Sequence, residues 1–175
     1  EKYCSDALLI QAANPVFEGV TLIHRMSKIK VVGVCHGHLG YRDVVRRLGL
    51  NEENVRVTIA GFNHNVWLKD FLYKGENAYP ILDEWIEKKA VDYWSSEEYL
   101  KSLPWECEQM SPAAVEMYRL YGLFPIGDAV RSASPWWFHK DLESKKKWFG
   151  PTGGFDSEIG WTLYLNFLQA ILNLN

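Results

Sequence analysis

The sequence has few cysteines, little net charge and no long hydrophobic run. Its 175 residues include 3 Cys, and 19 Lys and Arg against 22 Asp and Glu leave a formal net charge of -3. A surface that binds nucleic acid needs a basic patch, so nucleic acid is not an expected partner. No stretch approaches the roughly 20 apolar residues of a membrane-spanning helix. Three irregularly spaced cysteines form neither a disulfide framework nor a zinc module, which predicts a reducing cytoplasmic location.

Glycine-rich nucleotide loops are also missing, since neither G-x-G-x-x-G nor G-x-x-x-x-G-K-S/T occurs. The chain does not begin with Met, and its first apolar segment follows almost at once, which suggests a fragment of a longer protein. What is abundant is aromatic side chains, with 8 Trp, 9 Tyr and 8 Phe. Such a content fits a sugar-binding cleft, a large core or a subunit contact equally well.

The first part of the chain has the pattern of a parallel sheet. Residues 7–13 read as a buried strand that ends at Asn14-Pro15, residues 16–26 as a helix, and residues 30–35 as a second apolar strand. A strand, a helix and a second strand in this order predict a parallel βαβ crossover. The segment therefore looks like the end of an α/β sheet.

The rest of the chain mixes strands and helices. We predict strands at 55–62 and 67–73, and helices at 41–48, 81–89, 111–121 and 156–174. Ser111 has the position of an N-cap, with Pro112 in the first helical position. Residues 94–110 read as irregular, and residues 125–131 as a loop between helices.

The tetrad Cys35-His36-Gly37-His38 follows the second predicted strand directly. Open α/β sheets place their ligands at the carboxyl ends of strands. A thiolate and an imidazole both bind first-row divalent metals. The alternative is a buried, inert Cys beside surface histidines, and the tetrad by itself leaves both open.

His64 ends the next predicted strand, and the intervening helix and strand are long enough to bring it back beside Cys35. A Cys and His pair leaves coordination positions open for a substrate, as in catalytic metal sites. A His that only bonds to backbone at a strand end is the alternative. Further along, Asp128 and Arg131 have the chemistry of a general base and of a group that holds a substrate oxygen. Asp128 also fits an ordinary helix N-cap.

Taken together, these motifs resemble glycoside hydrolase family four. The matching blocks, in the same order and spacing, are Ala12-Ala13-Asn14-Pro15, Gly33-Val34-Cys35-His36-Gly37-His38, Asn63-His64 and Pro125-Ile126-Gly127-Asp128-Ala129-Val130-Arg131. The linking segments 77–80, 111–114 and 156–161 match as well, so the similarity runs through nearly the whole chain.

The resemblance implies an NAD- and metal-dependent glycosidase, with NAD and Mn²⁺ or another divalent first-row metal as cofactors. In that family NAD takes hydride from carbon 3 of the sugar, which acidifies the proton on carbon 2. The metal stabilises the enolate while a base removes this proton and the glycosidic oxygen leaves. Water then adds back, and the reduced cofactor restores the hydroxyl.

The resemblance also implies roles for single residues. Cys35 and His64 match the metal ligands, and Asp128 matches the proposed base. His36 would take a polar or acid role facing the leaving group. These four residues would form the catalytic centre.

Asn14 matches a residue that binds sugar hydroxyls near the cofactor, and Asn63 and Arg131 match substrate contacts. The Cys-His-Gly-His tetrad looks like the α-glucosidase branch, which predicts unphosphorylated α-glucosides as the small-molecule substrate. An α-glucuronidase or α-galacturonidase is the nearest alternative, in which Arg131 or His139 would pair with a sugar carboxylate.

The implied fold is α/β, with the last strands of a Rossmann-type parallel sheet running into an α+β domain like the C-terminal domain of lactate and malate dehydrogenases. Residues 1–38 would end a dinucleotide-binding fold whose Gly-rich loop is absent. Residues 39–175 would form a catalytic domain incomplete at its C-terminus, in a homo-dimer or tetramer. Two other classes stay open: a hydroxy-acid dehydrogenase, and an inactive carbohydrate-binding fragment that uses Trp136 to Phe138.

Overall fold

The computed structural model describes residues 3, 6–13 and 15–173. The chain divides into two compact units, Glu1–His38 and Leu39–Asn175. These are the ranges of the two domains expected from the sequence, while the cofactor and catalytic functions assigned to them stay predictions. Each unit is described by itself below.

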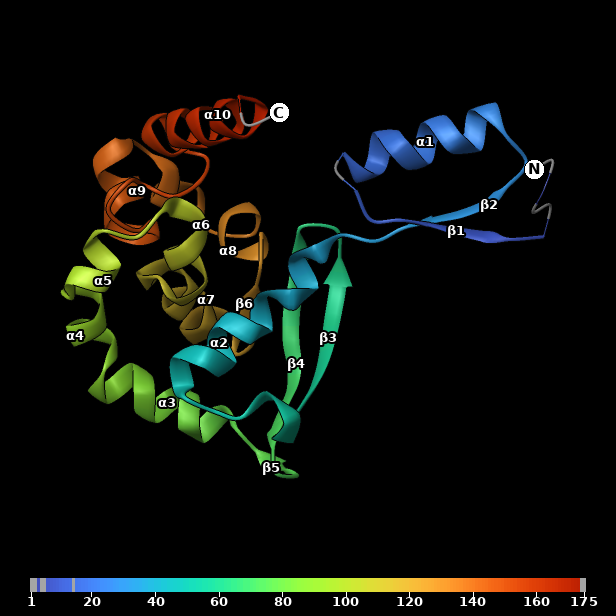
Figure 1. Cartoon of the computed structure of the whole chain (residues 1–175). Coiled ribbons are helices and arrows are strands. Elements are labelled where there is room, and N and C mark those ends of the chain that lie inside the picture. Colours follow the sequence, from blue (N-terminus) through green and yellow to red (C-terminus); the bar gives the residue numbers. More distant parts are fainter. Residues whose placement is uncertain (1–2, 4–5, 14, 174–175) are drawn as a thin grey trace. The chain divides into compact units, whose positions relative to one another are not determined.

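The first unit is a parallel βαβ unit, as predicted. It consists of β1 (Leu8–Gln11), α1 (Val16–Met26) and β2 (Lys30–Gly33), in the order that Figure 1 traces from the N-terminus. β1 and β2 pair in parallel, from Leu8 opposite Lys30 to Gln11 opposite Gly33. At Gly33 a Cβ atom would lie 2.7 Å from the side chains of Val16 and Val20, so only glycine lets α1 pack this closely on β2. The α/β start of the fold is confirmed. The prediction that the first strand is buried was wrong, because the two strands and one helix of this unit leave Leu8, Leu9 and Ile10 exposed.

The second unit contains the remaining elements. They are α2 (Tyr41–Leu48), η2 (Glu52–Asn54), β3 (Val55–Phe62), β4 (Asn65–Tyr73), β5 (Glu76–Asn77), α3 (Tyr79–Lys88), α4 (Ala90–Trp94), α5 (Glu97–Leu100), α6 (Pro104–Cys107), η3 (Glu108–Met110), α7 (Pro112–Tyr121), β6 (Phe124–Ile126), α8 (Ala129–Ser132), η4 (Trp136–His139), α9 (Leu142–Phe149) and α10 (Glu158–Leu172). The short 3₁₀ helix η1 (His36–Gly40) runs across the boundary between the two units. This mixture confirms the predicted α+β class.

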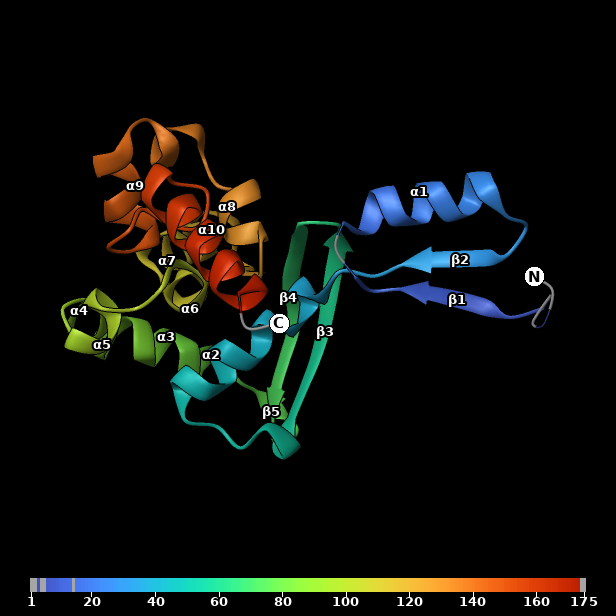
Figure 2. The same ribbon diagram turned by 45° about the horizontal axis from the view of Figure 1, so that its top comes forward.

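The sheet of this unit is built around β4. β3 and β4 form a long antiparallel hairpin, and β5 and β6 also pair with β4 in antiparallel fashion. Figures 1 and 2 both show helices α3 to α9 gathered on one side of this hairpin. The expectation of a loop over residues 125–131 was wrong, because Phe124–Ile126 is a strand. Three residues that include a proline are too short for a period-two pattern, and their partners on β4 are distant in sequence.

The segment before α7 is also more regular than predicted, since α5, α6 and η3 lie within residues 94–110. The predicted start of α7 is confirmed. The Ser111 side chain accepts a hydrogen bond from the Ala114 N–H, and Pro112 occupies the first turn. α7 then ends at Gly122, whose φ of 74° lies in the left-handed region that glycine adopts without strain. Among the described residues, no helix is long and apolar enough to cross a membrane.

The core of the second unit lies between the sheet and the helices. Its largest fully buried side chains include Leu68 and Phe71 from β4, Leu82 from α3, Val115 and Met117 from α7, and Phe124 from β6. Because β6 and β4 both contribute, the strand that precedes Asp128 is anchored in the core. Packing therefore fixes the backbone on which this part of the site depends.

Replacing Phe71 by Ala is expected to cost about 3–5 kcal/mol in free energy of unfolding, because it leaves a cavity in the core. Phe71 is 1% exposed, whereas Phe62 on the partner strand is 74% exposed. The matched variant Phe62→Ala is expected to change the free energy by only about 0.5 kcal/mol. Urea denaturation followed by circular dichroism measures both. Similar losses in the two variants would contradict this description of the core.

Candidate active site

His64 lies in the two-residue connection Asn63-His64 of the β3–β4 hairpin. It has a φ of 58°, which places it in the left-handed region. A residue outside the hairpin also holds this turn, because the Ser132 hydroxyl donates a hydrogen bond to the His64 carbonyl. A Cβ atom at Gly61 would lie 2.0 Å from the Asn65 carbonyl oxygen, so the hairpin needs a glycine there. The hairpin thus holds the imidazole at its tip, at an exposed position.

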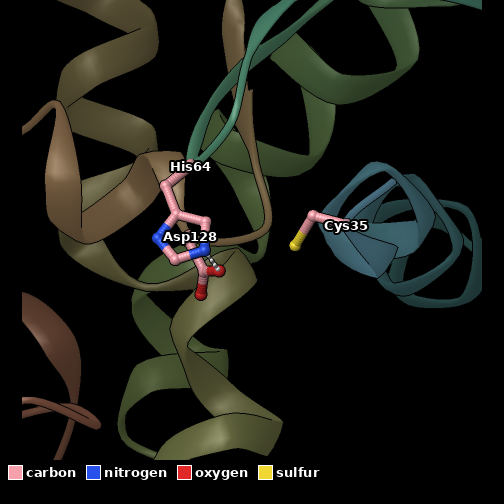
Figure 3. Close-up of side chains that lie close together, drawn as sticks. All are labelled: Cys35, His64 and Asp128. Carbon is pink, nitrogen blue, oxygen red and sulfur yellow. Dashed lines mark ion pairs between the residues drawn. The ribbon is translucent and has the colours of Figure 1, made fainter. Parts of the chain in front are cut away.

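Asp128 lies between β6 and α8, and its carboxylate is directed at other side chains. Although it precedes α8, its side chain makes no capping hydrogen bond. Instead, its Oδ2 lies 3.3 Å from the Nε2 of His64, and its Oδ1 accepts from a guanidinium nitrogen of Arg131. Figure 3 shows the facing imidazole and carboxylate. The simple N-cap interpretation of Asp128 is therefore wrong.

Arg131 is the centre of a partly buried charge cluster. Its Nε lies 3.0 Å from Glu108 Oε2, its Nη1 lies 2.9 Å from Asp156 Oδ1, and its Nη2 pairs with Asp128. The guanidinium carbon also lies 4.9 Å from the centre of the Phe155 ring. Burial by itself lowers the pKa of Arg131, but the surrounding carboxylates, Glu108 foremost, raise it overall. Every guanidinium nitrogen thus faces a carboxylate, and the substrate contact expected of Arg131 stays a prediction.

Glu108 is a member of this cluster that the sequence did not indicate. Its side chain is almost fully buried, and burial raises its pKa to about 8 against the opposing effect of Arg131. Its Oε1 is buried with no hydrogen-bond partner among the described residues. Glu108 belongs to no recognised motif, and its pairing with Arg131 joins two segments that only folding brings together. No sequence signal could have found it.

The other predicted site residues are distributed as follows. Cys35, a free and partly buried cysteine, and His36, the first residue of η1, belong to the first unit. The Cys35 carbonyl lies 2.8 Å from Nδ1 of His38. Asn63 is exposed beside His64, and Asn14 lies outside the described residues.

Three side chains of the predicted site carry atoms that can bind a metal ion: the thiol of Cys35, the imidazole of His64 and the carboxylate of Asp128. Figure 3 draws all three. Within the second unit, the structure brings His64 and Asp128 together.

Comparison with known proteins defines the class. The chain matches the model of family 4 glycosyl hydrolases over residues 1–51 and the model of the C-terminal domain of this family over residues 59–155. The chain therefore belongs to family 4 of the glycosyl hydrolases, and the resemblance drawn from the sequence is confirmed.

Curated relatives differ in the sugar that their names report. The chain is 29% identical over 90 residues to an α-galactosidase of Bacillus subtilis (strain 168), which covers 51% of this chain and 21% of that protein. It is 28% identical over 96 residues to an α-galacturonidase of Thermoanaerobacter italicus, covering 50% and 21%. An α-galacturonidase of Bacillus subtilis aligns over 160 residues at 24% identity, covering 78% and 35%. The matches thus span between about a fifth and a third of these relatives.

Solved structures share the fold. A crystal structure of a Bacillus subtilis protein described as a glucosidase superposes with a TM-score of 0.59 at 22% identity, covering 99% of this chain and 41% of that one. A 6-phospho-α-glucosidase from gut microorganisms, in complex with NAD and Mn²⁺, gives a TM-score of 0.52 at 16% identity, covering 82% and 32%. At these identities the likeness shows the fold alone.

Proposed function

We propose that this protein hydrolyses α-glycosidic bonds in unphosphorylated α-glucosides by the oxidation, elimination, addition and reduction sequence that uses NAD and a divalent metal. The observation that carries the proposal is the pair formed by His64 and Asp128, whose imidazole and carboxylate lie 3.3 Å apart in a chain of family 4. A metal ligand beside a base is the arrangement that this chemistry requires.

The donor set fits a first-row divalent metal such as Mn²⁺. Cys35 and His64 would hold it, since a thiolate and an imidazole are both suitable ligands and leave positions open for substrate. When bound, the metal supplies Lewis acidity at a sugar oxygen and NAD accepts a hydride. The solved 6-phospho-α-glucosidase with NAD and Mn²⁺ supports this choice of cofactors.

Chain length also supports the inclusion of Cys35. At Gly40 a Cβ atom would lie 2.6 Å from the Gly127 nitrogen, so Gly40 packs against the residue that precedes Asp128. Five residues of chain span at most roughly 18 Å. The chain between Cys35 and Gly40 therefore limits their separation to roughly 18 Å.

Asp128 would accept the proton from carbon 2 of the sugar. Arg131 holds its Oδ1, which leaves Oδ2 on the side of His64. Asn14, Asn63 and His36 would bind the sugar or face the leaving group, roles that rest on the family resemblance.

The sugar is proposed to be neutral because neither side chain considered as a partner for a sugar carboxylate, Arg131 or His139, is a free cation. Arg131 already faces three carboxylates. His139 Nε2 lies 2.7 Å from the Ser134 hydroxyl, and burial lowers the pKa of His139, which disfavours its charged form. An α-galacturonide is the second candidate, because an α-galacturonidase aligns with 78% of the chain.

An assay with matched aryl α-glucoside, α-galactoside and α-galacturonide tests the proposal. We expect release of the sugar only when NAD and Mn²⁺ are both present, with no net accumulation of NADH, because the cofactor is recycled. Steady accumulation of NADH would instead indicate a hydroxy-acid dehydrogenase. Sugar binding without cleavage, in the presence of both cofactors, would indicate a carbohydrate-binding protein.

A further inference from the structure

Gln109 makes two short hydrogen bonds to the strand that leads to Asp128. Its side-chain Nε2 donates to the Pro125 carbonyl at 2.6 Å, and its Oε1 accepts from the Gly127 N–H at 2.6 Å. Gln109 is 7% exposed, so these bonds are largely shielded from water. Among the described strands β6 pairs with β4 alone. The Gln109 side-chain amide therefore makes the hydrogen bonds that a neighbouring strand would make on the edge of β6 opposite β4.

Glu108, the preceding residue, acts on Asp128 from the other side. Its Oε2 lies 3.0 Å from Nε of Arg131, and the same guanidinium bonds Asp128 Oδ1 through Nη2. Two consecutive residues of η3 thus hold the backbone before Asp128 and the side chain of Asp128. Ser111, the residue that follows η3, caps α7, so η3 itself is anchored to a helix.

Stability alone does not account for Glu108. Its carboxyl is almost fully buried, and its pKa is raised from the ordinary value of 4.5 to about 8. A carboxyl whose pKa is higher in the folded than in the unfolded protein destabilises the folded state once the pH exceeds the unfolded pKa. This free-energy cost grows with pH until the pH passes about 8, the pKa of Glu108 in the folded protein. Removing one partner of a buried ion pair is destabilising when it leaves the other charge unpaired, but Arg131 keeps Asp128 and Asp156 as partners when Glu108 is lost.

We propose that Glu108 and Gln109 are positioning residues that aim the Asp128 carboxylate at His64, Glu108 through Arg131 and Gln109 through the Gly127 amide. A displacement of about 1 Å at a reacting group can lower a rate about 100-fold. Loss of either anchor frees the loop between β6 and α8 to move by such an amount. The catalytic part of this inference rests on the proposed function, and the geometric part does not.

The main test is Glu108→Gln, which keeps the size of the side chain and replaces its ionisable carboxyl by a neutral amide. We expect an unchanged or higher melting temperature, together with a changed side-chain ¹⁵N shift of the His64 imidazole at one fixed pH, because its carboxylate partner has moved. In the NAD- and Mn²⁺-loaded protein we expect kcat to fall about 10–100-fold while KM stays within about twofold.

The control is Glu143→Gln, which removes the surface ion pair between Glu143 and Lys146. The Glu143 side chain is 83% exposed. This variant is expected to leave the His64 shift and kcat unchanged. Gln109→Met, which removes both bonds to β6, is expected to reproduce the shift of the His64 signal and to move the Gly127 amide signal as well. If Gln109→Met does not fold, Glu108→Gln alone decides.

A wild-type His64 spectrum in Glu108→Gln would overturn the proposal, and so would a loss of kcat that follows the unfolded fraction. If the wild-type protein shows no glycosidase activity, the proposed function fails while the imidazole spectrum still decides the positioning role. The two failures are therefore distinguishable.

Discussion

Asp128→Asn is expected to lower kcat for α-glycoside hydrolysis by about 10²–10⁴-fold, the contribution typical of a general base. The amide keeps the size of the side chain but could not accept the proton from carbon 2 that the proposed mechanism assigns to Asp128. Since substrate contacts are unchanged, KM is expected to change little. Steady-state kinetics with NAD and Mn²⁺ present, together with a melting curve, measure the effect.

Asp156→Asn is the matched control for this variant. Asp156 also pairs with Arg131, at 2.9 Å, but its side chain is 62% exposed, and among the described residues the carboxylate that pairs with His64 is that of Asp128. Its loss is expected to lower kcat less than tenfold. Equal effects at the two positions would assign the loss to the charge of the cluster and would remove Asp128 from the role of base.

His64→Ala and Cys35→Ser are each expected to weaken Mn²⁺ binding at least about 100-fold. Loss of an outer-shell partner already costs 10–100-fold in metal affinity, and loss of a direct ligand costs at least as much. The free Mn²⁺ signal in electron paramagnetic resonance, recorded during a titration of the chain, gives the affinity. A chelator should abolish activity, and added Mn²⁺ should restore it.

Cys107→Ser is the control for the cysteine. Cys107 is buried, and burial raises its pKa to about 11, which disfavours the thiolate that binds metals. It is expected to leave the Mn²⁺ affinity unchanged. Unchanged affinity in both Cys35→Ser and His64→Ala would refute the proposed ligands.

Local patterns predicted most elements of the fold correctly. The two strands and the intervening helix of residues 8–33 were recognisable because both strands are short apolar runs bounded by turn residues. Ser111-Pro112 marked the start of α7 because a capping hydroxyl and a proline in the first turn are local features. By contrast, β6 and the short helices of residues 97–107 were missed, because tertiary contacts stabilise segments too short to carry a period.

The sequence by itself determined the family and the identities of the candidate residues, because motif spacing along the chain carries both. Tertiary structure alone decided which side chains meet. It paired Asp128 with His64, removed the N-cap explanation for Asp128, and enclosed Arg131 among three carboxylates. It also brought Glu108 and Gln109 to the site. The reason is physical: the burial and pairing of a charge depend on contacts between distant segments, which no local pattern encodes.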